Sequence, residues 1–233
     1  MSRTTVELIP WDHESREHRD RLIDQRIACG WHSDKVQGEW KDEQRAGAKC
    51  IYWLAIPKDN PNYESCVKTH NASYPKQASP LVDTAISVRG TDRNPTHQSF
   101  HPVGHVSLDM RFPAAESLDL DLPETGAIWI KTLYVSNALQ SSGIGRAAMD
   151  AVEAMATEEP ICARTLMLDT VCKEDQMRED FARGFYGYVP KIANEDWYGR
   201  RGYRIVARVP GFYKEVDQGK WKITTVFMRM DLA

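Results

Sequence analysis

The residues best suited to chemistry lie where a strongly apolar run, residues 127–135, gives way to a loop of small residues. An Ala-rich helical pattern follows. A helix that begins in such a loop exposes backbone N–H groups, and its dipole adds positive potential there. Glycines let phosphate oxygens approach the backbone, and an arginine adds a charged contact. The segment therefore predicts a phosphate cradle, made of Gln140, Ser141, Ser142, Gly143, Ile144, Gly145 and Arg146.

The glycine spacing alone leaves three interpretations open. The first is a plain strand-to-helix turn that uses glycines for tight packing. The second is a dinucleotide-binding fold, because Gly143, Gly145 and Ala148 fit G-x-G-x-x-A and Asp169 ends the next strand. That fold usually opens a parallel array, whereas this chain ends in two strands joined by a loop. The third interpretation is a cradle for another phosphate-bearing cofactor.

Two motifs, in order and spacing, resemble the GNAT superfamily of N-acetyltransferases. The family signature Q/R-x-x-G-x-G/A is met by Gln140, Gly143 and Gly145, shortly after a strand end. One strand later, Trp197-Tyr198 followed by Gly202-Tyr203 is similar to the family's Φ-Y-x-x-x-G-F/Y helix end. The resemblance covers residues 104–232, matches residues 1–57 by element order only, and does not extend to residues 58–102.

The resemblance implies acetyl-CoA as co-substrate and direct attack on its thioester by a primary amine in a ternary complex. Pantetheine would pair with the backbone of Leu133, Tyr134 and Val135, and the diphosphate would lie on residues 140–146. A backbone N–H near Leu133 would stabilise the oxyanion. Tyr198 would protonate the leaving thiolate. Asn194 is a further cofactor-binding candidate, although the family's usual asparagine position holds Lys191.

The general base is not assigned. Many family members have a glutamate on the central strand where this chain has Trp129. Asp109 and Glu124 are the alternative carboxylates considered, beside a water-mediated route. The loop at 210–220 contains Glu215 and Asp217, which would attract a cationic amine. The missing glutamate keeps a non-catalytic acyl-CoA-binding or sensing protein as the alternative, and the Gly-x-Gly match keeps an NAD(P)-binding oxidoreductase.

The apolar patterns predict the elements that position these residues. The predicted class is α/β (α+β): a central mixed, mostly antiparallel sheet of about seven strands, with helices on both faces. One domain, 1–233, would carry an insertion at about 58–102 with a single strand at 84–88. Leu22, Ile23 and Ile27 would form the apolar face of the first helix. Strands are predicted at 6–9, 50–56, 104–110, 127–135, 165–171, 203–209 and 221–232, and helices at 15–28, 31–44, 143–156, 173–182 and 194–201.

Composition narrows the function classes. The 233 residues carry 30 Lys and Arg against 33 Asp and Glu, a net charge of -3, so nucleic acid is not an expected partner. The five cysteines are scattered and predict neither disulfides nor a metal site. His97, His101 and His105 are interpreted as incidental. Without a signal peptide or membrane span, the protein is predicted to be cytoplasmic, as a monomer or homodimer.

Overall fold

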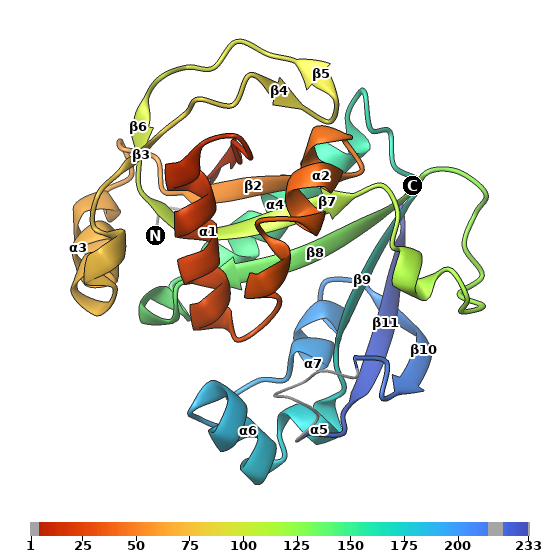
Figure 1. Cartoon of the computed structure of the whole chain (residues 1–233). Helices are drawn as coiled ribbons and strands as arrows, with labels where there is room; N and C mark the ends of the chain where they lie inside the picture. The colour runs from red at the N-terminus through yellow and green to blue at the C-terminus, as the bar shows by residue number, and fades with distance from the viewer. Residues whose placement is uncertain (1–4, 214–220, 233) are drawn as a thin grey trace. The chain divides into compact units, whose positions relative to one another are not determined.

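The computed structural model describes residues 5–213 and 221–232 (Figure 1). Internal contacts divide the chain into two compact units. The first unit comprises residues 1–111 and 130–161, and the second comprises residues 112–129 and 162–233. Strand β8 contributes to both units, because the boundary falls between Trp129 and Ile130.

The central sheet has seven strands in the order β1-β2-β7-β8-β9-β11-β10. The pairs β1–β2, β2–β7, β9–β11 and β10–β11 are antiparallel, and β8–β9 is parallel. The prediction of a mixed, mostly antiparallel sheet is confirmed, and the parallel array of a dinucleotide-binding fold is contradicted. The strands are β1 Glu7–Pro10, β2 Lys49–Ala55, β7 Pro102–Asp109, β8 Ala127–Val135, β9 Thr165–Val171, β10 Arg204–Pro210 and β11 Thr224–Asp231.

Helices lie on both faces of the sheet in the first unit. In Figure 1, α1 (Arg16–Cys29) and α2 (Glu39–Arg45) lie in front of β2 and β7, and α4 (Ile144–Thr157) lies behind them. The predicted helix at 31–44 is shortened to α2 and a 3-10 turn, Ser33–Lys35. All eight residues of β7 are buried, because helices cover both faces.

The buried face of α1 is mostly polar. Leu22 and Ile23 contact the core as predicted, whereas the prediction for Ile27 is wrong. Ile27 is 63% exposed. Polar side chains turn inward and hydrogen-bond to neighbouring segments, an arrangement that sequence hydropathy does not anticipate. The buried residues of α1 are His18, Arg21, Leu22, Gln25 and Arg26, at helical spacing.

The insertion is folded into the first unit and contains more than the single strand predicted at 84–88. It contains α3 (Tyr63–Ser73) and the short pairs β3–β6 and β4–β5. Leu81 and Phe100 reach the same hydrophobic core as Trp11 and Trp53. The short strands are β3 Leu81–Val82, β4 Ser87–Val88, β5 Thr91–Asp92 and β6 Ser99–Phe100.

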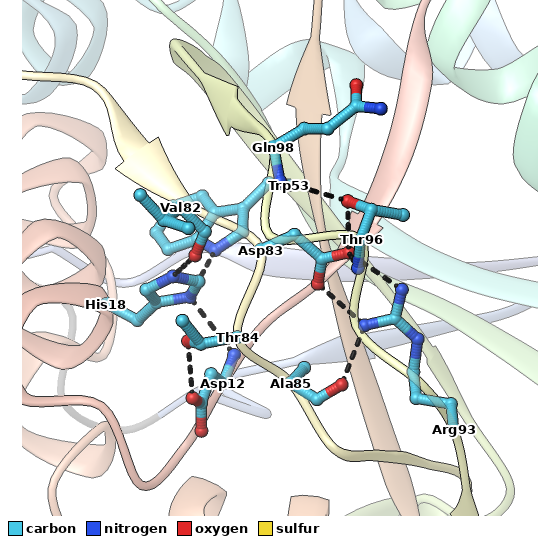
Figure 2. A network of polar contacts seen from close by, with 10 residues as sticks. All are labelled: Asp12, His18, Trp53, Val82, Asp83, Thr84, Ala85, Arg93, Thr96 and Gln98. Carbon is cyan, nitrogen blue, oxygen red and sulfur yellow. Dashed lines mark hydrogen bonds and ion pairs between the residues drawn. The ribbon is translucent and has the colours of Figure 1, made fainter.

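A buried carboxylate organises the insertion's second half (Figure 2). Both oxygens of Asp83 accept from Nη1 and Nη2 of Arg93, at 2.6 and 2.8 Å, and the Thr96 amide donates to it at 2.8 Å. These bonds hold the pKa of Asp83 at about 2, despite burial, which opposes this shift. Nearby, Nδ1 of His18 accepts from Trp53 Nε1 at 3.1 Å, which ties α1 to β2.

The second unit packs β9, β10 and β11 on a separate apolar core of Ala115, Leu120, Trp129, Met167 and Phe227. The predicted helix at 173–182 is two helices instead, because the helical pattern stops at Met177 and restarts at Glu179. The helices of this unit are α5 Lys173–Gln176, α6 Glu179–Tyr186 and α7 Asn194–Gly199.

Candidate cofactor and acyl-transfer site

Strand β8 departs from regular strand geometry before its end. Thr132 has a φ of 56°, in the left-handed region that a β-branched residue rarely adopts. The register that joins β8 to β9 covers three pairs, from Ala127–Thr165 to Trp129–Met167. Leu133, Tyr134 and Val135 lie beyond that register, after the distorted residue. Their backbone is thus at the part of β8 where the regular ladder with β9 has ended.

The predicted cradle residues come together at the start of α4. Ser141 and Gly143 have φ angles of 66° and 88°, so the chain turns sharply before the helix begins. The first helical hydrogen bond runs from Ala147 N to Gly143 O, at 3.0 Å. The amides of residues 144–146 therefore precede the first intrahelical bond, as in any helix N-terminus.

The structural need for glycine differs between positions 143 and 145. Gly143 is the N-cap of α4, and its positive φ makes any L side chain strained there. Gly145 has no such requirement: a Cβ built on it would lie 3.9 Å from Cγ2 of Val135, an ordinary contact distance. Neither packing nor backbone conformation requires glycine at position 145. Its missing side chain leaves space beside Val135.

The remaining cradle side chains are mostly exposed. Arg146 and Ser141 lie at the surface, whereas Ile144 is buried under the helix. The Gln140 amide donates to Asn137 Oδ1 at 3.0 Å, and the Ser142 hydroxyl donates to Leu139 O at 2.5 Å. The Arg146 guanidinium is thus available at the same helix end as the exposed amides.

The insertion borders the cradle, which the sequence did not predict. An open hollow of about 210 Å³ is lined by cradle residues and by the first turn of α3. The lining side chains are all uncharged: Ile56, Asn60, Asn62, Ser65, Cys66, Ser142 and Ile144.

Buried polar contacts join the insertion to the end of β8. His70 Nδ1, on α3, lies 2.9 Å from the hydroxyl oxygen of Ser136. Burial, with Arg21 and His101 nearby, lowers the pKa of His70 to about 4, so its imidazole is neutral at physiological pH. Burial and a hydrogen bond with Tyr74 raise the pKa of Tyr134 well above its ordinary value. Both contacts fix the strand end from which the cradle starts.

The second unit carries Tyr198 and Asn194 on helix α7. Tyr198 is 9% exposed, and its ring packs on Trp197 and Tyr203, with centroids 4.9 and 5.9 Å away. Asn194 is exposed, and its backbone N–H donates to Gln176 Oε1 at 2.7 Å. Ala193, rather than Asn194, is the N-cap of this helix.

The carboxylates considered as bases have different surroundings. Asp109 is buried and forms an ion pair with Lys49, its partner in the register between β2 and β7. Its carboxylate therefore has a structural role in the sheet. Glu124 is exposed. Trp129 packs in the core of the second unit against Phe112 and Phe227. Glu215 and Asp217 lie outside the described residues.

No group of three His, Cys, Asp or Glu side chains within the described ranges is placed to hold a metal ion. His105 is fully buried on β7, and His101 lies 3.1 Å from the Tyr63 hydroxyl. In the same ranges, none of the helices combines the length and apolarity needed to span a membrane.

Comparison with known families gives one sequence match. Residues 76–186 match the model of the acetyltransferase (GNAT) family. The match includes the whole cradle and ends before α7. Among curated proteins, none matches the chain.

Solved structures share the fold at low sequence identity. Arabidopsis thaliana NAA60 in complex with a bisubstrate analogue is 16% identical, with a TM-score of 0.56 over 98% of this chain and 100% of that one. An aminoglycoside 6'-N-acetyltransferase complexed with coenzyme A is 12% identical, with a TM-score of 0.52 over 97% and 96%. A spermidine N-acetyltransferase chimera from Vibrio cholerae and hSSAT is 7% identical, with a TM-score of 0.54 over 98% and 96%.

Proposed function

We propose that this chain, whose residues 76–186 match the acetyltransferase (GNAT) family model, transfers the acetyl group of acetyl-CoA to a primary amine. The acceptor is a small molecule or a peptide, and the amine attacks the thioester directly while both substrates are bound. The cofactor site is the cradle at residues 140–146 together with the backbone of Leu133, Tyr134 and Val135.

The cradle is the observation that carries this proposal. The first turn of α4 presents backbone N–H groups that have no intrahelical acceptor, and the helix dipole is positive at this end. Together with the exposed Arg146, these groups favour binding of a diphosphate. Gly145 leaves space that packing does not need. The plain-turn interpretation explains Gly143, but it gives no reason for the second glycine.

The chemistry assigns separate tasks to residues of this chain. The neutral amine attacks the thioester carbonyl, and negative charge develops on the carbonyl oxygen. We place the N–H of Leu133 against that oxygen. Collapse of the intermediate expels the thiolate of CoA, and Tyr198 donates its phenolic proton to that sulfur. The excess proton of the amine leaves to water or to a base that we do not assign.

The insertion belongs to the same proposed site. Asn62 and Ser65 line the hollow that also includes Ser142 and Ile144. A hollow of about 210 Å³ holds only part of a molecule as large as acetyl-CoA. We therefore assign to α3 a contact with the phosphate end of the cofactor, next to the diphosphate.

The experiment combines binding and turnover. Calorimetry with acetyl-CoA should show stoichiometric binding, and release of free CoA thiol should require an amine. The panel contains spermidine, aminoglycosides, amino acids and short peptides. Binding without thiol release from any amine would instead favour a non-catalytic acyl-CoA-binding or sensing protein. Absence of acetyl-CoA binding would contradict the proposal altogether, and a fluorescence response of NADH would revive the oxidoreductase alternative.

A further inference from the structure

Arg26 is buried in the first unit without a carboxylate among its hydrogen-bond partners in the described residues. Its side chain comes from α1 and is 3% exposed. Nε donates to the backbone oxygen of Trp31 at 2.7 Å, and the guanidinium lies 5.3 Å from the centre of the Trp40 ring. A buried guanidinium is costly unless its donors are well used. Its position therefore calls for an explanation beyond packing.

Its Nη1 atom is within hydrogen-bonding distance of two acceptors, one on β7 and one on β8. One is Nε2 of His105 at 3.3 Å, and the other is the carbonyl oxygen of Thr132 at 3.5 Å. Nη1 carries two N–H groups and can serve both. His105 Nδ1 lies 2.8 Å from Gln25 Oε1, so Nδ1 carries the proton and Nε2 is free to accept from Arg26. The neutral state agrees with the burial of His105, which places its pKa well below the ordinary value.

Thr132 is the residue of β8 with a left-handed backbone. Such a conformation is unfavourable for a β-branched residue and persists only where surrounding contacts hold it. Two contacts do so here: Arg26 at the carbonyl, and the Thr132 hydroxyl donating to Ser107 Oγ at 3.2 Å.

The carbonyl of Thr132 and the N–H of Leu133 belong to the same peptide group. In a trans peptide these two bonds point in opposite directions. A cation at the carbonyl therefore turns the Leu133 N–H away from Arg26. It also draws electron density toward the carbonyl oxygen, which makes the N–H a stronger donor.

We propose that Arg26 is a positioning residue for acyl transfer: it holds and polarises the 132–133 peptide so that the Leu133 N–H faces the thioester carbonyl. The inference rests on the proposed function, because that function supplies the thioester. Arg26 itself touches neither substrate. Its effect reaches the reacting carbonyl through one peptide group.

The test measures carbonyl polarisation directly and needs no knowledge of the acceptor. Acetyl-CoA labelled with carbon-13 at the acetyl carbonyl is bound to the full chain, and the carbonyl stretch is recorded by isotope-edited infrared difference spectroscopy. In the unmodified protein the band should move to lower frequency than in free acetyl-CoA. In Arg26→Gln the band should return at least about halfway, while the acetyl-CoA Kd changes by no more than about threefold.

Arg21→Gln is the matched control. Arg21 is also on α1 and 6% exposed, but its guanidinium donates to Ser79 O in the insertion. This variant also removes a buried guanidinium from α1, yet it should leave the carbonyl band in place. If Arg26 had only a structural role, Arg26→Gln would behave like Arg21→Gln. Both variants would then have a lower Tm, and the carbonyl band would move in neither.

Arg26→Lys provides a second variant if Arg26→Gln does not fold. Its ammonium keeps the charge but cannot reproduce the guanidinium geometry, so an intermediate band is expected. An unchanged band in the folded Arg26 variants would overturn the inference and leave the acetyltransferase proposal intact. An unshifted band in the unmodified protein would instead remove Leu133 as the oxyanion donor, and with it the proposed mechanism.

Discussion

His70 of the insertion and Ser136 at the end of β8 form a buried contact, with 2.9 Å between Nδ1 and the hydroxyl oxygen. His70 is 1% exposed and Ser136 is fully buried. Ser136 is followed by the turn that leads into the cradle, and α3 carries the residues that line the hollow beside it. The insertion and the loop of the predicted cradle therefore belong to one structural unit, joined by a polar contact in the interior.

The neutral His70 predicts loss of stability in acid. The pKa of His70 is about 4 in the folded protein and 6.5 in the unfolded chain, so the unfolded chain takes up the proton first as pH falls. The stabilisation is complete above pH 6.5 and is lost between 6.5 and 4. At about 1.4 kcal/mol per pH unit, His70 alone accounts for roughly 2 kcal/mol at pH 5.

Urea unfolding at pH 7.5, 6 and 5 measures this effect. His70→Asn, which can still hydrogen-bond to Ser136, should flatten the decline below pH 6.5, whereas replacement of the exposed His97 should not. Equal slopes in both variants would show that His70 does not carry the effect.

Gly145→Val should weaken acetyl-CoA binding at least tenfold, about 1.4 kcal/mol, with little change in Tm. The Cβ of the new residue meets no close contact, because the nearest atom, Cγ2 of Val135, is 3.9 Å away. It would occupy the space that the cofactor needs. Ala154→Val, on the exposed side of the same helix, adds similar bulk and should bind normally. Normal binding by Gly145→Val would remove the main support for the cradle.

Negative charge in the hollow should reduce affinity for the phosphate end of the cofactor. Asn62→Asp and Ser65→Asp place a carboxylate among uncharged lining residues, and each should raise the acetyl-CoA Kd about tenfold. Acetyl-pantetheine, which lacks the diphosphate, should bind both variants as it binds the unmodified protein. Ala72→Asp, exposed on the same helix and outside the hollow, is the control. If the lining variants behave like Ala72→Asp, α3 does not contact the cofactor.

Tyr198→Phe should lower kcat about 100-fold once an acceptor is found, with the acetyl-CoA Kd unchanged. The reason is the loss of the proton for the departing thiolate. Tyr203→Phe is the control, because the ring centroids of Tyr203 and Tyr198 are 5.9 Å apart. It tests whether loss of another tyrosine hydroxyl from this cluster lowers kcat as much. An amine whose acetylation proceeds at full rate in Tyr198→Phe would refute the assignment, and a fall in Tm alone would show a packing role.

Local patterns anticipated much of the fold. The predicted strands 127–135 and 165–171 coincide with β8 and β9, because long apolar runs between polar loops leave little freedom in placing a buried strand. The turn into α4 was also anticipated, since glycine spacing at a strand-to-helix junction is a local property. Helix α3 was not, because its residues are mostly polar and its burial is limited to His70.

The sequence by itself determined the order of the elements, the turn into α4 and the family resemblance, all of which depend on residues close together along the chain. Only the tertiary structure decided which face of α1 is buried, the left-handed backbone of Thr132, and the meeting of Arg26, His105 and that carbonyl. Arg26 and Thr132 are far apart in sequence, and a threonine in a strand carries no sign of an unusual φ. Such features arise where long-range contacts override local preference, so they become visible only after the chain has packed.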